Sequence, residues 1–227
     1  MNPKDIAATR AVEYIKDGMV VGLGTGSTAA FAIAALGNKL ASTPLRIACV
    51  ATSDGTAALA QSHNLTLVEW DQMSRIDVTI DGADEVDPAF RMIKGGGGAL
   101  LREKIAASVT RTEIIIVDRS KLVENLGRHP LPIVVTPYGW QSTASRLEAR
   151  FARPVIRRTS PNGTPFLTDD GLVVLDMAFG SPLPSPDKLE AQLKNIVGVV
   201  EVGLFVGLCQ RLIIGNDDGT IEERVVG

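Results

Sequence analysis

Residues 19–40, MVVGLGTGSTAAFAIAALGNKL, contain the change of pattern that decides the fold. The apolar run from Met19 to Leu23 is typical of a short buried strand, and the residues from Ser27 to Leu40 return to a helical pattern. Gly24-Thr25-Gly26 joins the two as a tight turn. A buried strand that passes through a tight turn into a helix begins a strand–helix–strand unit, and such units build parallel sheets.

The alternation of strand and helix extends well beyond this segment. A helix is expected near the N-terminus, where Ile6, Val12 and Ile15 recur at roughly helical spacing. Further strands are expected at residues 45–50, 65–68, 76–80 and 113–117, and further helices at residues 54–62 and 99–109. This order predicts an α/β fold with an open, mostly parallel, doubly wound (Rossmann-like) sheet that helices cover on both faces.

A second unit is expected to begin where Gly127, Pro130, Pro132 and Pro137 follow one another closely. Its predicted elements are strand 133–136, helix 140–151, strands 154–158 and 172–176, helix 186–196 and strand 199–202. This is the βαββαβ order of a smaller, ferredoxin-like α+β domain. We therefore predict an α/β catalytic domain of residues 1–126 plus 204–227 and a smaller domain of residues 127–203. The short strands after residue 204 are expected to pack back on the first domain.

Composition and charge disfavour several classes of function. The chain has 227 residues, 45% of them hydrophobic, and a net charge of -3 without a block of lysine or arginine, which favours a small-molecule partner over nucleic acid. It has no run of eighteen apolar residues and no basic leader before an apolar stretch, so we expect neither membrane insertion nor secretion. Cys49 and Cys209 lie in or near apolar runs, which predicts buried thiols in a reducing compartment and a cytoplasmic protein.

The first motif that could bind a ligand or take part in chemistry is the turn Gly22 to Thr28, between the first strand and its helix. Small residues at a helix N-terminus let backbone N–H groups and hydroxyls face an anion. The motif lacks the Gly-Lys-Ser/Thr ending of a P-loop, and Ser27 stands where a dinucleotide fingerprint has its third glycine. Nucleotide binding is therefore disfavoured. Binding of a single phosphate group remains a reasonable interpretation. The alternative is that the glycines only form a tight turn and that Ser27 caps the helix.

The second motif is the acidic segment Asp81-Gly82-Ala83-Asp84-Glu85-Val86-Asp87, directly after the strand 76–80. Open parallel sheets usually bind ligands at the carboxyl ends of their strands. Three interpretations remain open for the segment: a divalent-metal site, acid/base groups that handle sugar hydroxyls, or a solvated acidic turn.

The third motif runs from Lys94 through Gly95 to Gly98 and into a helix that carries Glu103 in its first turn. An ordered run of glycines sacrifices chain entropy, so it indicates backbone close to a ligand, with N–H groups available to an oxyanion; the alternative is disorder. Glu103 is either a carboxylate favoured by the helix dipole or a general base, and spacing alone does not separate the two.

Other reactive residues give weaker signals. His63 and His129 are far apart in sequence and lack metal-ligand spacing, and no G-x-S-x-G nucleophile elbow occurs. We therefore predict neither a zinc site nor serine-hydrolase chemistry. Lys121 follows the strand that ends at Asp118, where a lysine is either a solvated surface residue or a point charge for a phosphate.

Taken together, these motifs resemble the A-type ribose-5-phosphate isomerase family in order and spacing. The resemblance is carried by GLGTGSTAAF (22–31), VTIDGADEVD (78–87), IKGGGGALLREKI (93–105) and VDRSKLV (117–123). It continues through LPIVVTP (131–137), RPVIRR (153–158), TDDGLVVLDMAFG (168–180), GVVEVGLF (198–205) and LIIGNDDGT (212–220), and so covers nearly the whole chain.

The resemblance implies a role for each part of the three motifs. Glu103 would be the catalytic base, and Lys94 with the N–H groups of Gly95, Gly96 and Gly97 would stabilise the developing oxyanion. Asp81 and Asp84, in a loop with Gly82 and Ala83, would bind sugar hydroxyls and assist ring opening. The residues implied for the phosphate are Thr25, Gly26, Ser27, Thr28, Lys121 and Lys4.

The resemblance also implies the reaction and its setting. The activity would be the interconversion of D-ribose 5-phosphate and D-ribulose 5-phosphate through an enediolate, without cofactor or metal, in the pentose phosphate pathway or in carbon fixation. The family's habit of assembly implies a homodimer or homotetramer. A coenzyme A transferase and a catalytically silent sugar-phosphate sensor are the alternatives. The combined DGAD and KGGGG segments argue against the transferase, and a sensor would have no reason to retain Glu103.

Overall fold

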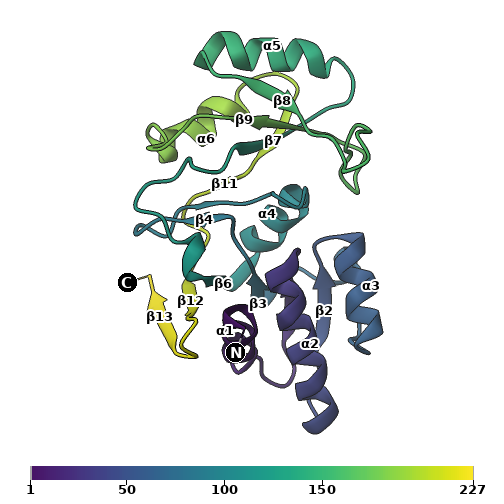
Figure 1. The fold of residues 1–227 in the computed structure, drawn as a ribbon. Helices are drawn as coiled ribbons and strands as arrows, with labels where there is room; N and C mark the ends of the chain where they lie inside the picture. The colour runs from purple at the N-terminus through teal and green to yellow at the C-terminus, as the bar shows by residue number, and fades with distance from the viewer. Residues whose placement is uncertain (1, 227) are drawn as a thin grey trace. The chain divides into compact units, whose positions relative to one another are not determined.

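The computed structural model describes residues 2–226, and the chain divides into two compact units (Figure 1). Unit 1 comprises the residues up to Ala83, Arg102–Leu122 and the residues from Gly207 onward, whereas unit 2 comprises Asp84–Leu101 and Val123–Val206. This division differs from the predicted domain boundaries mainly at residues 84–101, which group with unit 2. Both units are therefore assembled from separate stretches of sequence.

Unit 1 is built on a six-stranded sheet. Its strands, in spatial order, are β13 (Ile221–Val225), β12 (Arg211–Gly215), β6 (Thr110–Asp118), β3 (Ile76–Asp81), β1 (Val20–Leu23) and β2 (Ala48–Ala51). Neighbouring strands run parallel except β12 and β13, which form an antiparallel pair at one edge. The predicted open, mostly parallel sheet is confirmed.

Side-chain caps define the start of two helices of unit 1. Its helices are α1 (Pro3–Val12), α2 (Ser27–Ser42), α3 (Asp54–Ser62) and most of α4 (Leu100–Ser108). The Asn2 side chain accepts a hydrogen bond from the Lys4 N–H (3.0 Å) just ahead of Pro3. The Ser53 hydroxyl likewise accepts from the Thr56 N–H (3.0 Å). Both helices therefore begin at a residue that the sequence specifies locally.

The central strand β6 shows that both faces of the sheet are covered. Each residue from Ile114 to Val117 is at most 1% exposed. Because successive side chains of a strand point to opposite faces, an unbroken buried run requires cover on both sides. On one side, Ala8 of α1 and Ile33 of α2 belong to the same buried cluster as Ile213 of β12. The expectation of a sheet with two covered faces is confirmed.

The strand predicted at residues 65–68 is reduced to a single bridge. Leu67 pairs with Cys49 of β2 in parallel, and the Val68 N–H donates to the Cys49 carbonyl (3.0 Å). The chain then turns into the 3-10 helix η1 (Trp70–Gln72), so pairing stops after one residue. The prediction of a full strand was wrong because its apolar residues pack against the edge of the sheet without extending it.

Both cysteines are buried, as the sequence predicted: Cys49 is 0% and Cys209 is 3% exposed. Burial raises the pKa of the Cys49 thiol to about 12, because a thiolate would lose its hydration in the core. Cys49 is therefore a thiol at neutral pH and acts as a small apolar core residue.

The four-stranded sheet of unit 2 has the predicted ferredoxin-like order. Its elements along the chain are β7 (Leu131–Val135), α5 (Trp140–Phe151), β8 (Val155–Arg157), β9 (Val173–Met177), α6 (Pro186–Lys194) and β10 (Val199–Val202). The spatial order is β10-β7-β9-β8, with every neighbouring pair antiparallel. Leu147 of α5 and Leu193 of α6 are fully buried in the same cluster as Val135 and Leu175 of the sheet. The βαββαβ prediction is confirmed.

A small three-stranded sheet in unit 2 was not predicted. Its strands, in the order β11-β5-β4, are β11 (Leu204–Phe205), β5 (Met92–Ile93) and β4 (Glu85–Val86), all antiparallel to their neighbours. This pairing is why residues 84–101 group with unit 2. The expectation that everything after residue 204 packs on the first domain is corrected for β11, whereas β12 and β13 do extend the sheet of unit 1.

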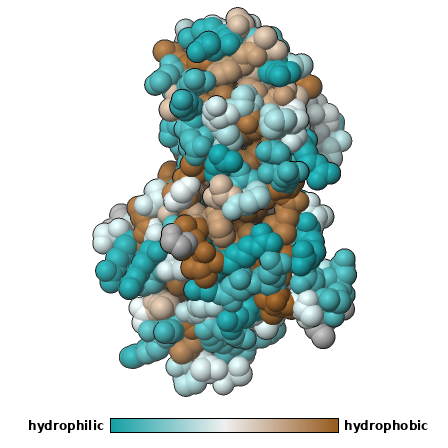
Figure 2. All heavy atoms as spheres, turned by 90° about the vertical axis from the view of Figure 1, so that its left-hand side faces the viewer, coloured by the Kyte–Doolittle hydropathy of each residue, from teal (hydrophilic) through white to brown (hydrophobic). Residues whose placement is uncertain are grey.

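The edge strand β13 has three charged side chains between its two apolar end residues. Ile221 and Val225 are 41% and 55% exposed, and between them Arg224 donates to Glu222 (2.7 Å). Charged side chains on an edge strand oppose pairing with a second sheet. Figure 2, which views the molecule from the side where Figure 1 places β13, shows hydrophilic and hydrophobic residues interspersed.

Within residues 2–226, no helix combines the length and apolar character needed to cross a membrane.

Candidate active site

The sheet of unit 1 reverses its strand order between β1 and β3. From β1 the chain moves outward to β2 and then returns to the other side of β1, where β3, β6 and β12 follow. Open α/β sheets bind ligands at such a switch point, outside the carboxyl ends of the strands. Two of the motifs meet there, because the turn after Leu23 ends β1 and Asp81 is the last residue of the neighbouring strand β3.

Asp81 is held by backbone groups at the switch point. Its carboxyl group is buried, with the residue 1% exposed, and Oδ1 accepts hydrogen bonds from the N–H groups of Gly82 (2.7 Å) and Thr25 (3.2 Å). A Cβ atom on Gly24 would overlap this carboxyl group and lie 2.6 Å from the Asp81 Cβ. Gly24 is therefore the residue that lets the β1 turn pass directly over the carboxylate.

Thr25 ties the same turn to the start of α3. Its hydroxyl lies 2.8 Å from that of Thr52, 2.9 Å from that of Ser53 and 3.1 Å from that of Thr56. The Thr56 hydroxyl in turn donates to the Gly24 carbonyl (2.9 Å). The structure thus shows Thr25 positioning the loop through its side chain, and this hydroxyl cluster was not predicted.

The first turn of α2 adjoins the acidic segment. Gly26, with φ +110°, is the N-cap, and no side chain caps the helix; the alternative in which Ser27 caps it was therefore wrong. The Ser27 hydroxyl instead accepts a hydrogen bond from Lys4 Nζ (3.1 Å). A Cβ atom on Gly82 would contact Thr28 at 3.5 Å. Uncapped N–H groups, two hydroxyls and an ammonium group therefore gather beside the end of β3.

Lys121 ends the 3-10 helix η2 (Arg119–Lys121), which follows β6 at the same edge of the sheet. A hollow of about 300 Å³ lies beside this segment, lined by Lys4 at the start of α1 and by Asp118 and Ser120, among others. The structure thus brings Lys4 to Ser27 and also to the segment that carries Lys121.

In unit 2, the glycine run forms an ordered turn against Asp84. Asp84 Oδ2 accepts a hydrogen bond from the Gly96 N–H (2.8 Å), and the Gly98 N–H donates to the Gly95 carbonyl (2.9 Å). Gly95 and Gly98 have positive φ, +101° and +86°. A Cβ atom on Gly96 would lie 2.8 Å from the Asp84 carboxylate, and one on Gly95 would lie 2.6 Å from Leu100. Disorder, the alternative for this run, is not what the structure shows.

Lys94 precedes the glycine turn and is almost completely buried, at 3% exposure. Its N–H donates to the Gly203 carbonyl (2.8 Å), which fixes the backbone beside β5 and β11. Its ammonium group lies 5.4 Å from the ring centroid of Phe205, a cation–π contact. The backbone bond and the ring contact together hold Lys94 beside the start of the glycine turn.

Glu85 and Asp87, the other two acidic residues of the segment, have structural partners. Glu85 accepts hydrogen bonds from the N–H groups of Gly127 (2.8 Å) and His129, and Asp87 forms an ion pair with Arg91 (2.7 Å). Both carboxylates are buried, so a solvated acidic turn does not describe them. Among the residues that the structure describes, no cluster of three or more His, Cys, Asp or Glu is suited to a metal ion.

Glu103 lies in the first turn of α4 and is 5% exposed. The preceding residue, Arg102, forms an ion pair with Asp54 at the start of α3 (2.8 Å), and this bond restrains α4 within unit 1.

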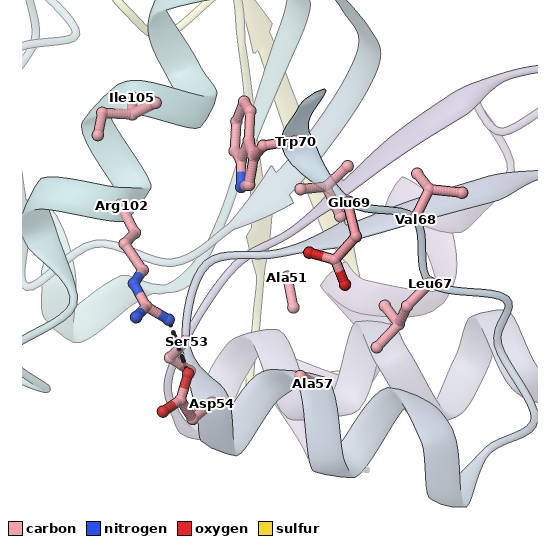
Figure 3. Close-up of a pocket in the computed structure, with 11 residues that line it drawn as sticks. Ala51, Ser53, Asp54, Ala57, Leu67, Val68, Glu69, Trp70, Arg102 and Ile105 are labelled. Atoms are coloured by element: carbon pink, nitrogen blue, oxygen red, sulfur yellow. Dashed lines mark hydrogen bonds and ion pairs between the residues drawn. The ribbon is translucent and has the colours of Figure 1, made fainter. Parts of the chain in front are cut away.

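Figure 3 shows this pair at one side of a pocket of about 440 Å³, with Trp70 and Ile105 on another side. None of the predicted site residues lines this pocket.

Unit 1 has a doubly wound sheet with a buried carboxylate at its switch point. In unit 2, a turn of glycines is hydrogen-bonded to a second carboxylate. Together these features are typical of an α/β enzyme. Residues 48–219 match the family model described as ribose 5-phosphate isomerase A (phosphoriboisomerase A). The chain is 51% identical over 218 residues to "Ribose-5-phosphate isomerase A" of Gloeobacter violaceus, an alignment that covers 95% of this chain and 93% of that protein. The chain therefore belongs to the ribose 5-phosphate isomerase A family and is an aldose–ketose isomerase by class.

Solved structures agree with this assignment. A D-ribose-5-phosphate isomerase in complex with phospho-erythronic acid is 38% identical, with a TM-score of 0.94 and complete coverage of both chains. Ribose 5-phosphate isomerase from Plasmodium falciparum is 34% identical, with a TM-score of 0.95, and the match covers 99% of this chain and 98% of that one. The resemblance seen in the sequence motifs is confirmed.

Proposed function

We propose that this chain interconverts D-ribose 5-phosphate and D-ribulose 5-phosphate by proton transfer through an enediolate, without a metal or cofactor. The observation that carries the proposal is the fixed carboxylate of Asp81 at the switch point, directly beside an uncapped helix N-terminus with Ser27 and Lys4. Family membership supports the substrate, because the relatives are named for it.

Glu103 is the proposed general base. Its carboxylate removes the proton from C2 of the open-chain aldose, the electron pair forms the C1–C2 double bond, and the aldehyde oxygen becomes an oxyanion. The same carboxylate then returns the proton to C1, while the hydroxyl proton on O2 is transferred to the O1 oxyanion and C2 becomes the ketone. One base serves both steps, which suits a single buried carboxylate in the first turn of a helix.

Lys94 and the N–H groups of the Gly95–Gly97 turn are proposed to stabilise the enediolate oxygens. Preorganised donors act most strongly on charge that develops away from water, and Lys94 is buried. The solved relative that binds phospho-erythronic acid supports this assignment, because a sugar acid ends in a planar, charged carboxylate that resembles an enediolate. Asp81 and Asp84, with Gly82 and Ala83 between them, are assigned to the sugar hydroxyls and to ring opening.

The phosphate is proposed to bind at the start of α2. The contributing residues are Thr25, Gly26, Ser27, Thr28, Lys121 and Lys4. A phosphate held at a helix N-terminus turns binding energy from a remote group into orientation at the reacting carbons. Unphosphorylated ribose is therefore expected to be a poor substrate.

Replacement of Lys4 by methionine is expected to weaken phosphate binding. Loss of one partly exposed charge should raise the KM for ribose 5-phosphate about five- to tenfold at low salt and leave kcat within about twofold. Added salt should reduce the effect, because it screens the charge. Lys16→Met, at an exposed position in the same unit, is the matched control and should leave both constants unchanged. A Lys4→Met variant with an unaltered KM at low salt would remove Lys4 from the phosphate site.

The activity itself is tested with EDTA-treated protein and ribose 5-phosphate, followed by formation of the ketose. Turnover that survives EDTA and is not increased by added divalent metal is the expected result. Tight binding of ribose 5-phosphate without turnover would contradict the proposal and favour the sugar-phosphate sensor.

The cellular setting is part of the same proposal. We expect the enzyme to work in the cytoplasm, in the non-oxidative pentose phosphate pathway or in carbon fixation, as a homodimer or homotetramer. The support is family membership together with two buried thiols, which suit a reducing compartment.

A further inference from the structure

Arg158, which follows β8 in unit 2, is bound to the backbone of the glycine turn. Its Nη1 donates hydrogen bonds to the carbonyl oxygens of Gly95 (2.7 Å) and Gly96 (3.0 Å). Its other two nitrogens bind the carboxylate of Asp176 on β9: Nε donates to Oδ2 (2.8 Å) and Nη2 donates to Oδ1. The Arg158 side chain is 14% exposed. A two-point ion pair therefore holds the guanidinium while a third nitrogen holds the loop.

The two carbonyl contacts determine where the loop's N–H groups point. In a trans peptide the C=O and the following N–H lie on opposite sides. Because the Gly95 and Gly96 carbonyls both face Arg158, the N–H groups of Gly96 and Gly97 face away from it. The Gly96 N–H reaches Asp84 on that side, as this geometry requires (2.8 Å). The Gly97 N–H is turned the same way, toward the side of the turn on which Asp84 lies.

Phe166 packs against the glycine turn beside Arg158. Its N–H donates to the Arg158 carbonyl (3.0 Å), and its ring centroid lies 5.9 Å from the guanidinium carbon. A Cβ atom on Gly98 would overlap that ring. The turn is thus packed on one side by an arginine and an aromatic ring, both from the segment between β8 and β9.

We propose that Arg158, braced by Asp176, is a positioning residue that orients the glycine turn so that its N–H groups, rather than its carbonyls, face the enediolate oxygen. Glycine peptides flip at little steric cost, and a flipped peptide would present a carbonyl dipole to the oxyanion and repel it. Arg158 opposes the flip by holding both carbonyls. The inference rests on the proposed function, in which Gly95 to Gly97 stabilise the oxyanion, and it gives unit 2 a part in the reaction.

The test compares kcat and KM for ribose 5-phosphate in Arg158→Met and Arg158→Lys. Arg158→Met should lower kcat about 10- to 100-fold with KM within about threefold, because transition-state donors are misplaced while the phosphate is still bound. Arg158→Lys keeps a charge but lacks the fork that binds two partners, so its kcat should be intermediate. Arg157→Met is the matched control, since Arg157 stacks on Trp140 at 4.7 Å, and its kcat should be unchanged.

A second readout separates positioning from general damage. Phospho-erythronic acid, with its charged carboxylate, should lose affinity across the Arg158 variants in proportion to their loss of kcat/KM, while inorganic phosphate should bind all of them equally. If Arg158→Met fails to fold, Arg158→Lys and Asp176→Asn carry the test. A kcat within about twofold of the unsubstituted protein in a folded Arg158 variant, or a loss confined to KM, would overturn the inference. Inactivity of the unsubstituted protein would instead contradict the proposed function.

Discussion

Glu103→Gln is expected to lower kcat for ribose 5-phosphate about 10²- to 10⁴-fold and to leave KM nearly unchanged. The amide has almost the shape of the carboxylate but accepts no proton from C2, so neither transfer of the isomerisation proceeds. Substrate binding should persist, because the groups assigned to the phosphate lie elsewhere, on α1, on η2 and on the turn before α2 with its first residues. Steady-state kinetics with purified protein measures both constants.

The matched control for this variant is Glu113→Gln. Glu113 is also a buried glutamate of unit 1, 2% exposed, and it lies in the first half of β6, away from the carboxyl ends of the strands. Its replacement tests whether exchanging a buried carboxylate for an amide disturbs the fold enough to slow the reaction, and we expect kcat to be unchanged within about twofold. Equal activity of Glu103→Gln and the unsubstituted protein would remove Glu103 from the role of base.

Gly24→Ala is expected to have the second-largest effect, on stability and activity together. The added methyl group would overlap the Asp81 carboxyl group, so the carboxylate must leave its place against the N–H groups of Thr25 and Gly82. Overpacking of this kind costs about 1–3 kcal/mol of the free energy of unfolding. A shift of a reacting group by about 1 Å costs on the order of 100-fold in rate. Thermal melts and kcat measure the two effects.

Gly55→Ala provides the control for Gly24→Ala. Gly55 lies in the first turn of α3, and the nearest atom to an added Cβ is the Ser53 hydroxyl at 3.9 Å. Since alanine is the better helix former, stability should be unchanged or increased by up to about 1 kcal/mol, and kcat should not change. If Gly24→Ala keeps full activity, the position of the Asp81 carboxylate does not matter to the reaction.

Sequence periodicity was sufficient to predict a helix or strand that is long enough to show a periodic pattern. The helix predicted at residues 54–62 is found within those bounds, as α3, because Ser53 caps it and an alanine-rich run follows. The two-residue strands β4, β5 and β11 have no periodicity to detect. β4 and β5 pair with each other across a short loop, and β11 joins them because Leu204 pairs with Ile93, more than a hundred residues away, which is tertiary information.

The candidate site shows the same contrast between local and distant information. Asp81 could be singled out because it ends an apolar strand, and the glycine turns could be noticed because runs of glycine are rare. The partner of each group could not be found this way. Arg158 reaches Gly95 across 63 positions and Lys4 reaches Ser27 across 23, and neither spacing follows a local rule. Nor does the acidic segment itself reveal that Glu85 holds a turn while Asp84 faces the glycines.

Isomerisation of ribose 5-phosphate in D₂O, followed by NMR over many turnovers, tests the central claim most directly. An enediolate whose proton is carried by Glu103 exchanges that proton with solvent, so deuterium should appear at C1 of ribulose 5-phosphate and at C2 of recovered ribose 5-phosphate. The Glu103→Gln protein should incorporate deuterium at a rate reduced in step with its kcat. Complete conversion without solvent deuterium at either carbon would mean a direct hydride shift and would contradict the account.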